Sequence, residues 1–178
     1  AAKMSKYIDE IIFSTNDRNY KKIAESYGLK VPFLRPNEFS KDTSTDREFL
    51  LHAMNWCKNE YSYIPEYWVH LRPTTPLRSP EVIDKAIELI LNEKNSTSLR
   101  SGHLAPESPF KWFKMTNNGK YFESININNS FEDEIYNMPK EIFEEVYIPN
   151  GYIDIVKFSY MYRRENIHGN KILAFKSP

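Results

Sequence analysis

Short apolar runs alternate with longer stretches of helical periodicity along much of the chain. The runs that are aliphatic or aromatic predict strands at residues 8–14, 31–34, 67–71 and 171–175. The stretches whose apolar residues fall on one face predict helices at residues 17–27, 46–58 and 79–92. Strands that alternate with helices in this way are typical of the βα units of a wound parallel sheet.

The alternation stops after Thr97, where the pattern becomes that of a hairpin. Aromatic segments at residues 110–115 and 121–125 flank the turn sequence Asn117-Asn118-Gly119, and together they predict two antiparallel strands. A hairpin this aromatic either folds onto the protein's own sheet or covers a partner subunit. The polar residues 126–145 that follow predict a loop or a short helix.

Composition and charge narrow the class of protein without identifying it. The chain of 178 residues has the length of one domain, and it carries 24 basic and 24 acidic side chains. This neutral balance gives no indication of a nucleic-acid or membrane partner. No apolar run approaches the roughly 20 residues of a membrane span, and the N-terminus does not resemble a signal peptide, so a cytoplasmic location is expected.

Cysteine and histidine offer little candidate chemistry. The single cysteine, Cys57, excludes a disulfide within the chain, and its place on an apolar helical face predicts a buried small side chain and not a nucleophile. The histidines do not have the spacing of metal ligands. We assign no catalytic residue and no metal ligand within this chain.

The loop after the predicted strand at residues 67–71 holds the most informative polar residues. Two prolines in this loop prevent further ladder pairing. In open α/β sheets ligands bind in the crevice beyond the strand ends, so we expect an anionic ligand to contact Arg72, Thr74, Thr75 and Arg78. The alternative is a solvated crossover loop whose arginines only keep it soluble.

Four segments, in order along the chain, resemble the motifs of one enzyme family. They read I-I-F-S-T-N-D at residues 11–17, V-P-F-L-R-P at 31–36, L-R-P-T-T-P-L-R at 71–78 and P-N-G-Y-I-D-I at 149–155. The set resembles the acylneuraminate cytidylyltransferases, which make CMP-sialic acid and related CMP-activated nonulosonic acids. The resemblance implies a Rossmann-like α/β fold with a wound, mostly parallel sheet of the nucleotide-diphospho-sugar transferase type. It also implies one truncated domain over residues 1–178, in which residues 104–148 form an inserted antiparallel hairpin segment for dimerisation.

The activity that the resemblance implies is the transfer of CMP from CTP to a nine-carbon sugar acid, with release of pyrophosphate. Mg²⁺ is the implied cofactor, and a homodimer is the implied assembly. Such a transfer depends on charge neutralisation and alignment more than on covalent catalysis by the protein. Two alternatives stay open: a non-catalytic relative or fragment that acts only as a nucleotide-binding, sugar-binding or dimerisation module, and a nucleotidyltransferase for a different base.

Roles on the nucleotide side follow from the resemblance. Arg35 matches the arginine that contacts the base, whereas on the sequence alone it could be a surface arginine before a proline. Ser44 and Thr45 align with the hydroxyl loop on the nucleotide side, although Asp46 stands where a serine is common. The alternative for both hydroxyls is that they cap the next helix.

Roles on the acceptor side also follow from the resemblance. Arg72 stands where the family more often has glutamine, and we expect it to read a modified nonulosonic acid because a guanidinium can pair with a carboxylate. Lys111 and Lys140 align with basic positions that approach the sugar carboxylate, with solvated surface positions as the alternative. Asn150 matches the asparagine that hydrogen-bonds the sugar, and Gly151 permits the turn after it.

Two motifs of the family have no counterpart in the sequence. One is the glycine-rich, basic loop that binds the triphosphate, and the other is the aspartate-bearing D-I-D run that is expected to hold magnesium. We therefore expect the chain to be a fragment that is truncated at both ends, with the ligands of the metal outside it.

Overall fold

The structure, a computed structural model, describes residues 1–61, 63–125, 134–164 and 166–177. The chain forms two compact units, and each is described by itself. Unit 1 contains Ala1–Ser101 and Gly151–Phe175, and unit 2 contains Gly102–Asn150 and Lys176–Pro178. The expected insertion for dimerisation at residues 104–148 stays a prediction.

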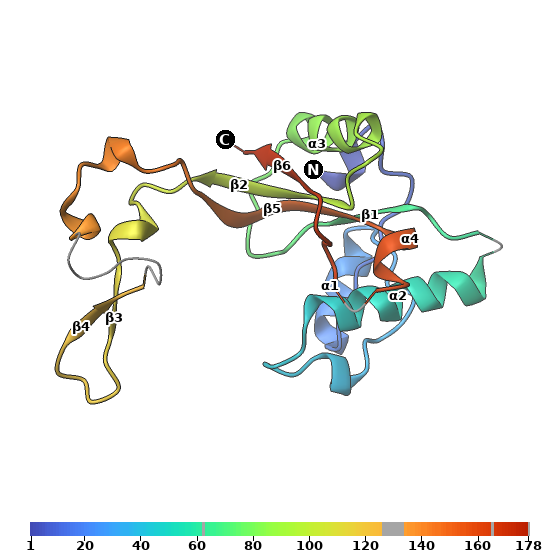
Figure 1. Cartoon of the computed structure of the whole chain (residues 1–178). Coiled ribbons are helices and arrows are strands. Elements are labelled where there is room, and N and C mark those ends of the chain that lie inside the picture. Colours follow the sequence, from blue (N-terminus) through green and yellow to red (C-terminus); the bar gives the residue numbers. More distant parts are fainter. Residues whose placement is uncertain (62, 126–133, 165, 178) are drawn as a thin grey trace. The chain divides into compact units, whose positions relative to one another are not determined.

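The helices of unit 1 are shown in Figure 1. They are η1 (Ala2–Met4), α1 (Arg18–Ser26), η2 (Asn37–Phe39), α2 (Asp46–Glu60), α3 (Pro80–Asn92) and α4 (Phe158–Met161). A four-stranded sheet has the order β1-β5-β2-β6, with β1 (Tyr67–His70), β5 (Tyr147–Lys157), β2 (Ser98–Leu104) and β6 (Ile172–Lys176). β1 and β5 are antiparallel, so that His70 lies opposite Asp154.

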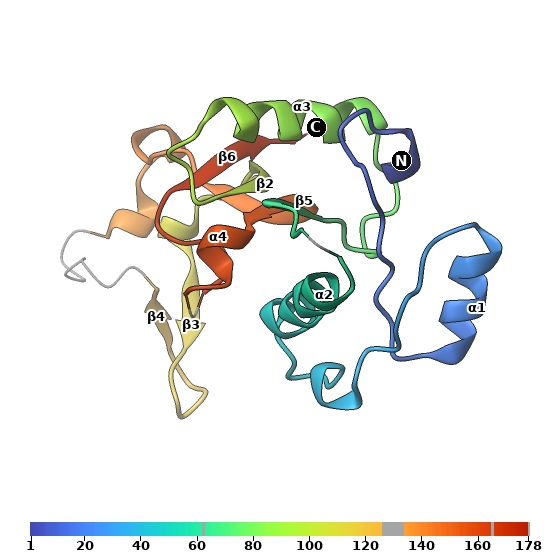
Figure 2. The same cartoon turned by 90° about the vertical axis from the view of Figure 1, so that its right-hand side faces the viewer.

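Helices cover both faces of the sheet in unit 1, as Figure 2 shows for α2 and α3. On one face, Ile83, Ile87 and Ile90 of α3 pack against Ile153 and Ile155 of β5. On the other face, α2 and α4 form a second apolar cluster with β5; its buried members are Leu50, Met54, Val156 and Met161. Because side chains alternate along a strand, Asp154 projects to the same face as Val156, the face that α2 covers.

The helices begin where their capping residues predict. Asp17 accepts hydrogen bonds from the first backbone N–H groups of α1, and Thr45 forms a capping box with Glu48 at the start of α2. Ser79 occupies the N-cap of α3, with Pro80 at the first helical position. The three predicted helices and the strand at residues 67–71 are therefore confirmed, with small shifts in their ends.

The prediction is wrong for two of the expected strands. Residues 8–14 and 31–34 form no strand; a single parallel bridge joins Ile12 to Lys30. The two segments run side by side only briefly, with the Phe13 N–H donating to the Lys30 carbonyl at 3.0 Å. Pro32 lacks the N–H group that a continued ladder would need.

The sheet is mixed, whereas a mostly parallel sheet was expected. β5 re-enters unit 1 from unit 2 and runs antiparallel to β1, instead of following a helical crossover. β2 was not predicted, because its N-terminal half carries serines at positions that are usually apolar. Ser98 and Ser101 are fully buried, and Ser101 Oγ accepts a hydrogen bond from the Ile153 N–H at 2.9 Å.

Unit 2 contains the predicted hairpin, formed by β3 (Phe113–Met115) and β4 (Phe122–Ser124), which are antiparallel. Gly119 in its turn has φ +67°, a conformation that favours glycine. The described residues of unit 2 also form short 3-10 helices: η3 (Pro109–Lys111), η5 (Ile135–Asn137) and η6 (Lys140–Ile142). Of the predicted loop or short helix at 126–145, residues 126–133 lie outside the described residues. Among the helices that are described, none is long and apolar enough to cross a membrane.

Candidate functional site

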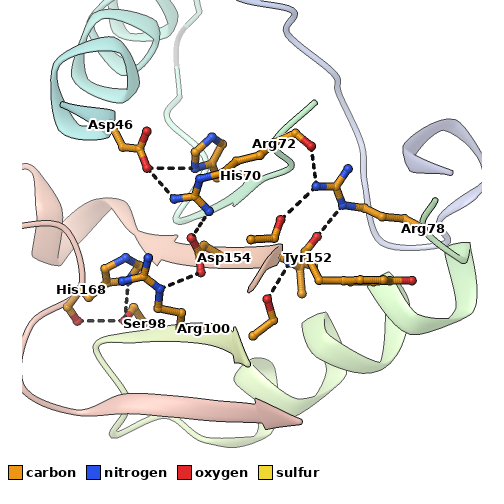
Figure 3. Close-up of polar contacts among 12 residues, drawn as sticks. Asp46, His70, Arg72, Arg78, Ser98, Arg100, Tyr152, Asp154 and His168 are labelled. Carbon is orange, nitrogen blue, oxygen red and sulfur yellow. Dashed lines mark hydrogen bonds and ion pairs between the residues drawn. The ribbon is translucent and has the colours of Figure 1, made fainter. Parts of the chain in front are cut away.

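Arg72, in the loop that follows β1, lies between two carboxylates (Figure 3). Its Nη1 donates to Asp154 Oδ2 at 2.5 Å, and its Nη2 donates to Asp46 Oδ2 at 2.5 Å. Asp154 comes from β5, and Asp46 is the first residue of α2. The Arg72 side chain is 22% exposed, so both bonds are partly shielded from water and both hold the guanidinium in one orientation.

Asp154 is the most deeply buried charged residue of this cluster, with 1% of its surface exposed. Its second oxygen, Oδ1, faces Nε of Arg100 on β2 at 3.5 Å, a distance that permits an ion pair but is longer than a good hydrogen bond. A buried carboxylate is costly unless it is paired, and Asp154 meets this requirement with two arginines.

Histidines flank the cluster on both sides, and both are held neutral. Burial, followed by the nearby Arg72 guanidinium, lowers the pKa of His70 below its ordinary value, although Asp46 at 4.0 Å acts in the opposite direction. Burial also lowers the pKa of His168, whose Nδ1 lies 3.3 Å from Ser98 Oγ. The ion pairs of Asp46 and Asp154 are therefore made with Arg72 and Arg100.

Arg78 joins the loop after β1 to the backbone of β5. Its Nε donates to the Tyr152 carbonyl at 2.5 Å, and its Nη2 donates to the carbonyls of Arg72 at 2.5 Å and Gly151 at 3.0 Å. The Ser79 N–H in turn donates to Tyr152 Oη at 2.9 Å. These bonds fix the backbone of the loop, so Arg78 holds the position of its neighbours.

The two threonines of the loop, Thr74 and Thr75, differ in their exposure to solvent. Thr74 is exposed to solvent, whereas Thr75 is half-buried and its N–H donates to the Arg72 carbonyl at 3.3 Å. A Cβ at Gly151 would lie 3.8 Å from Thr75 Oγ1, which places this hydroxyl beside Gly151 of β5. The structure thus brings together Arg72, Thr75 and Arg78, with Thr74 at the surface above them.

Arg35 lies close to the same end of α2. Its guanidinium is 5.0 Å from the ring centroid of Phe49, and the ring of Phe49 is in turn 5.2 Å from that of His70. One Arg35 nitrogen, Nη2, donates to the Ser14 carbonyl at 3.2 Å. Burial lowers the pKa of Arg35, which remains a cation at neutral pH. The ring of Phe49 on α2 therefore lies beside both Arg35 and His70.

The hydroxyls expected on the nucleotide side make local contacts. Ser44 Oγ donates to the Glu38 carbonyl at 3.2 Å and accepts from the Lys41 N–H at 3.0 Å. Thr45 is the N-cap of α2, and its N–H donates to Glu48 Oε2 at 2.5 Å. The capping alternative is thus realised for Thr45, and the role of both hydroxyls toward a nucleotide stays a prediction.

The three remaining predicted residues lie in unit 2. Lys111 Nζ donates to the Met138 carbonyl at 2.9 Å, and Lys140 Nζ donates to the Pro106 carbonyl at 2.7 Å. Asn150 Nδ2 donates to Ser177 Oγ at 2.6 Å. Within unit 2, both lysines therefore hold backbone carbonyls of the segment, which are neutral partners.

Sequence reasoning missed the two aspartates that bind Arg72. A signal was present for Asp154, because it is the only charged residue in the run Ile153–Val156 and a buried acid needs a cationic partner. Asp46 was identified only as a departure from the family pattern, without a partner. In the parts of the chain that the structure describes, no three histidine, cysteine or acidic side chains gather closely enough to hold a metal ion.

Two bacterial enzymes named for CMP transfer or CMP-activated acids are similar in sequence to part of this chain. The chain is 32% identical over 92 residues to the CMP-N,N'-diacetyllegionaminic acid synthase of Legionella pneumophila, a match that covers 50% of this chain and 38% of that protein. It is 35% identical over 89 residues to the N-acylneuraminate cytidylyltransferase of Escherichia coli, covering 50% of this chain and 20% of that protein. These matches therefore span well under half the length of either relative.

A third relative matches along almost the whole chain. The chain is 27% identical over 178 residues to the post-translational flagellin modification protein B of Campylobacter coli, covering 98% of this chain and 70% of that protein. This match includes both units.

Solved structures of similar fold include two synthases of other compounds. CMP:2-keto-3-deoxy-manno-octonic acid synthetase, complexed with CTP, has a TM-score of 0.64 at 12% identity, covering 99% of this chain and 75% of that one. The 4-diphosphocytidyl-2C-methyl-D-erythritol synthase of Anaerococcus prevotii has a TM-score of 0.56 at 11% identity, covering 99% and 73%. Both likenesses concern the fold, a mixed α/β fold with a mixed sheet.

The family model described as cytidylyltransferase matches residues 1–166, so this chain belongs to the cytidylyltransferase family.

Proposed function

We propose that this protein transfers CMP from CTP to a nonulosonic, sialic-type acid and releases pyrophosphate. The observation that carries the proposal is the similarity, over half of the chain, to two proteins named for CMP-activated acids of this kind. In the proposed reaction the anomeric hydroxyl of the acid attacks the α-phosphorus of CTP. Pyrophosphate leaves with the electrons of the broken phosphorus–oxygen bond.

The geometry of unit 1 supports this reaction because it fixes polar groups in place before a ligand arrives. Phosphoryl transfer depends on positioning and on electrostatic stabilisation. Arg78 fixes the backbone of the loop that carries Thr74 and Thr75. Arg35, placed against Phe49, is the proposed contact of the base, with Ser44 and Thr45 nearby along the chain.

The acceptor's carboxylate needs a cation, and the lysines of unit 2 suit this role. Arg72 is already paired with two carboxylates, whereas Lys111 and Lys140 bond to neutral carbonyls. Lys111 and Lys140 are therefore the proposed contacts of the sugar carboxylate, and Asn150 is the proposed contact of a sugar hydroxyl. The contacts with Asp154 and Asp46 use two of the five N–H groups of the Arg72 guanidinium, and we propose that another contacts a polar group of the acceptor.

Magnesium, a homodimer and a cytoplasmic location belong to the proposal as well. Bound Mg²⁺ would neutralise charge on the phosphates. The described residues do not supply a set of ligands for it, since Asp46 and Asp154 are engaged by Arg72, and we derive no step through the metal.

The test is an assay of pyrophosphate release from CTP with sialic, legionaminic and pseudaminic acids, carried out on the complete protein that contains these residues, with ATP, GTP and UTP as base controls. Turnover with CTP and one of these acids is the expected result. Binding of CTP without turnover of any acid would favour the non-catalytic alternative, and turnover with another nucleotide would favour a different base. Failure to bind CTP at all would contradict the proposal.

A matched pair of variants tests the role of Arg35. Arg35→Lys keeps the charge but loses the planar group that lies against Phe49, so it should raise the KM for CTP about tenfold. Arg18→Lys makes the same change on an exposed position of α1 and should leave the KM unchanged. Equal KM values for the two variants would remove Arg35 from the nucleotide site.

A further inference from the structure

Arg72 joins two elements that serve different halves of the proposed site. Asp46 follows Thr45 directly, at the junction between the loop of Ser44 and α2. The same turns of α2 carry Phe49, against which Arg35 lies. Through Asp46, Arg72 is therefore tied to the nucleotide side.

Through Asp154, Arg72 is tied to the acceptor side. Asp154 lies on β5, three positions after Gly151, in the strand segment that Arg78 binds through the carbonyls of Gly151 and Tyr152. Arg72 itself belongs to the loop of Thr74 and Thr75. One guanidinium thus links the start of α2, the acceptor loop and β5.

Of the two carboxylates, Asp154 is the fixed one. Its side chain is 2% exposed, whereas that of Asp46 is 38% exposed. Asp154 also has Arg100 at 3.5 Å on its other oxygen and is held in a strand between Ile153 and Ile155, which are fully buried. It cannot reach a substrate from this place, but it can determine where Arg72 points.

We propose that Asp154 is a positioning residue: it orients Arg72, and through the Arg72–Asp46 ion pair it sets the start of α2 relative to the acceptor loop. This inference rests on the proposed function for the identity of the two ligands. It differs from a role of Arg72 in reading the acceptor alone, because loss of Asp154 must then disturb the nucleotide side as well.

Variants of Asp154 and Arg72 can test the proposal because the two side chains form one buried ion pair. Asp154→Asn removes the charge that orients Arg72 and leaves a partly buried guanidinium with one carboxylate fewer. Arg72→Gln leaves the buried Asp154 with only the longer contact to Arg100. When both partners of a buried pair are replaced by neutral groups, no unpaired charge remains and part of the lost stability is recovered, but the link from Asp154 to Asp46 stays broken.

The experiment compares Asp154→Asn, Arg72→Gln and the double variant in the turnover assay. Each single variant should raise the KM for CTP and the KM for the acid, each by about tenfold. The double variant should lose no more than the worse of the two single variants, because both substitutions break the same link to Asp46. Asp84→Asn is the matched control, because Asp84 is a buried carboxylate of α3, 8% exposed, that bonds to Ser5 and the Lys6 N–H and to no arginine. It should leave both KM values unchanged.

Two results would overturn the proposal. One is a double variant whose losses equal the product of the two single losses. The other is Asp154→Asn with a lowered melting temperature but unchanged KM values. If Asp154→Asn does not fold, Asp46→Asn breaks the more exposed ion pair of Arg72 and must raise both KM values.

A second readout separates this inference from the proposed function. Hydrogen exchange in Asp154→Asn should be faster at the amides of Ser44, Glu48 and Thr75, which bond to the carbonyls of Lys41, Thr45 and Arg72. This holds even if the wild-type protein turns over no acid, in which case only the proposed function fails. Unchanged exchange at the start of α2 would overturn the positioning role whatever the activity.

Discussion

Gly151 packs directly against Arg72. Its backbone has φ +65°, and a Cβ at this position would lie 3.3 Å from Arg72 Cδ and 3.6 Å from Arg72 Nη1. Glycine is therefore favoured twice, by the left-handed backbone and by the tight contact with the neighbouring side chain. The motif P-N-G lies within β5, and its glycine thus has the additional effect of making room for Arg72.

Gly151→Ala should lower the free energy of unfolding by more than the backbone strain alone. The strain of a left-handed alanine costs about 1–2 kcal/mol, and the contact with Arg72 adds to it and displaces the guanidinium from Asp154. Urea unfolding measures the total loss. Gly119→Ala is the control, since Gly119 has φ +67° but a Cβ there would meet nothing within 4 Å. Equal losses for the two variants would show that Gly151 makes no special contact with Arg72.

Arg78→Lys should loosen the acceptor loop although the charge is kept. A lysine cannot bind the carbonyls of Arg72, Gly151 and Tyr152 together, and the lost hydrogen bonds should cost about 2 kcal/mol in the free energy of unfolding. Hydrogen exchange at the Thr75 amide should become faster than in wild type. Arg18→Lys, on the exposed side of α1, should change neither quantity. Slow exchange at Thr75 in Arg78→Lys would contradict this role of Arg78.

The helices were predictable because their signals are local. In α3 the apolar residues recur at helical spacing, and Ser79 and Pro80 mark its start, so sequence and structure agree there. β2 was not predictable, because Ser98 and Ser101 look like loop residues until their partners are known. Those partners, the His168 carbonyl and the Ile153 N–H, lie far away in the sequence.

The same reason explains what was missed in the candidate site. The motif identifies Arg72 as unusual, but its partner Asp154 is 82 residues away and its partner Asp46 is 26 residues away. Long-range ion pairs leave no periodic pattern in a single sequence. The sequence pattern after the predicted strand pointed to the residues of the loop, the resemblance assigned them to the acceptor side, and the structure was needed to find what orients them.

Lowering the pH should destabilise unit 1 through His70. Burial, and next the Arg72 guanidinium, keeps the pKa of His70 below the ordinary value of 6.5 in the folded protein. The unfolded chain therefore takes up a proton first, so the contribution of neutral His70 to stability is complete above about pH 6.5 and is lost as the pH falls from there toward the folded pKa. The free energy of unfolding should fall by up to about 1.4 kcal/mol per pH unit from this residue.

A variant of His70 isolates the contribution of this residue to the pH dependence of stability, because the other histidines are the same in both proteins. Urea unfolding of wild type and His70→Asn at pH 7.5 and 5.5 gives the difference directly. The variant should lose less stability between the two pH values, even if it is less stable at both. Equal losses would mean that His70 is already free to protonate in the folded protein.

Cys57 should resist thiol reagents until the protein unfolds. The residue lies on α2 with 2% of its surface exposed, and burial raises the pKa of its thiol to about 11. At pH 8 the folded protein therefore presents almost no accessible thiolate, whereas in urea the thiol returns to ordinary reactivity.

Because Cys57 is the only cysteine of the chain, labelling with 5,5'-dithiobis(2-nitrobenzoic acid) reports on it alone. Labelling should be slower by more than a hundredfold in buffer than in urea, and Cys57→Ala serves as the blank. Rapid labelling of the folded protein would mean that α2 separates from β5 and α4 far more often than their buried contacts permit.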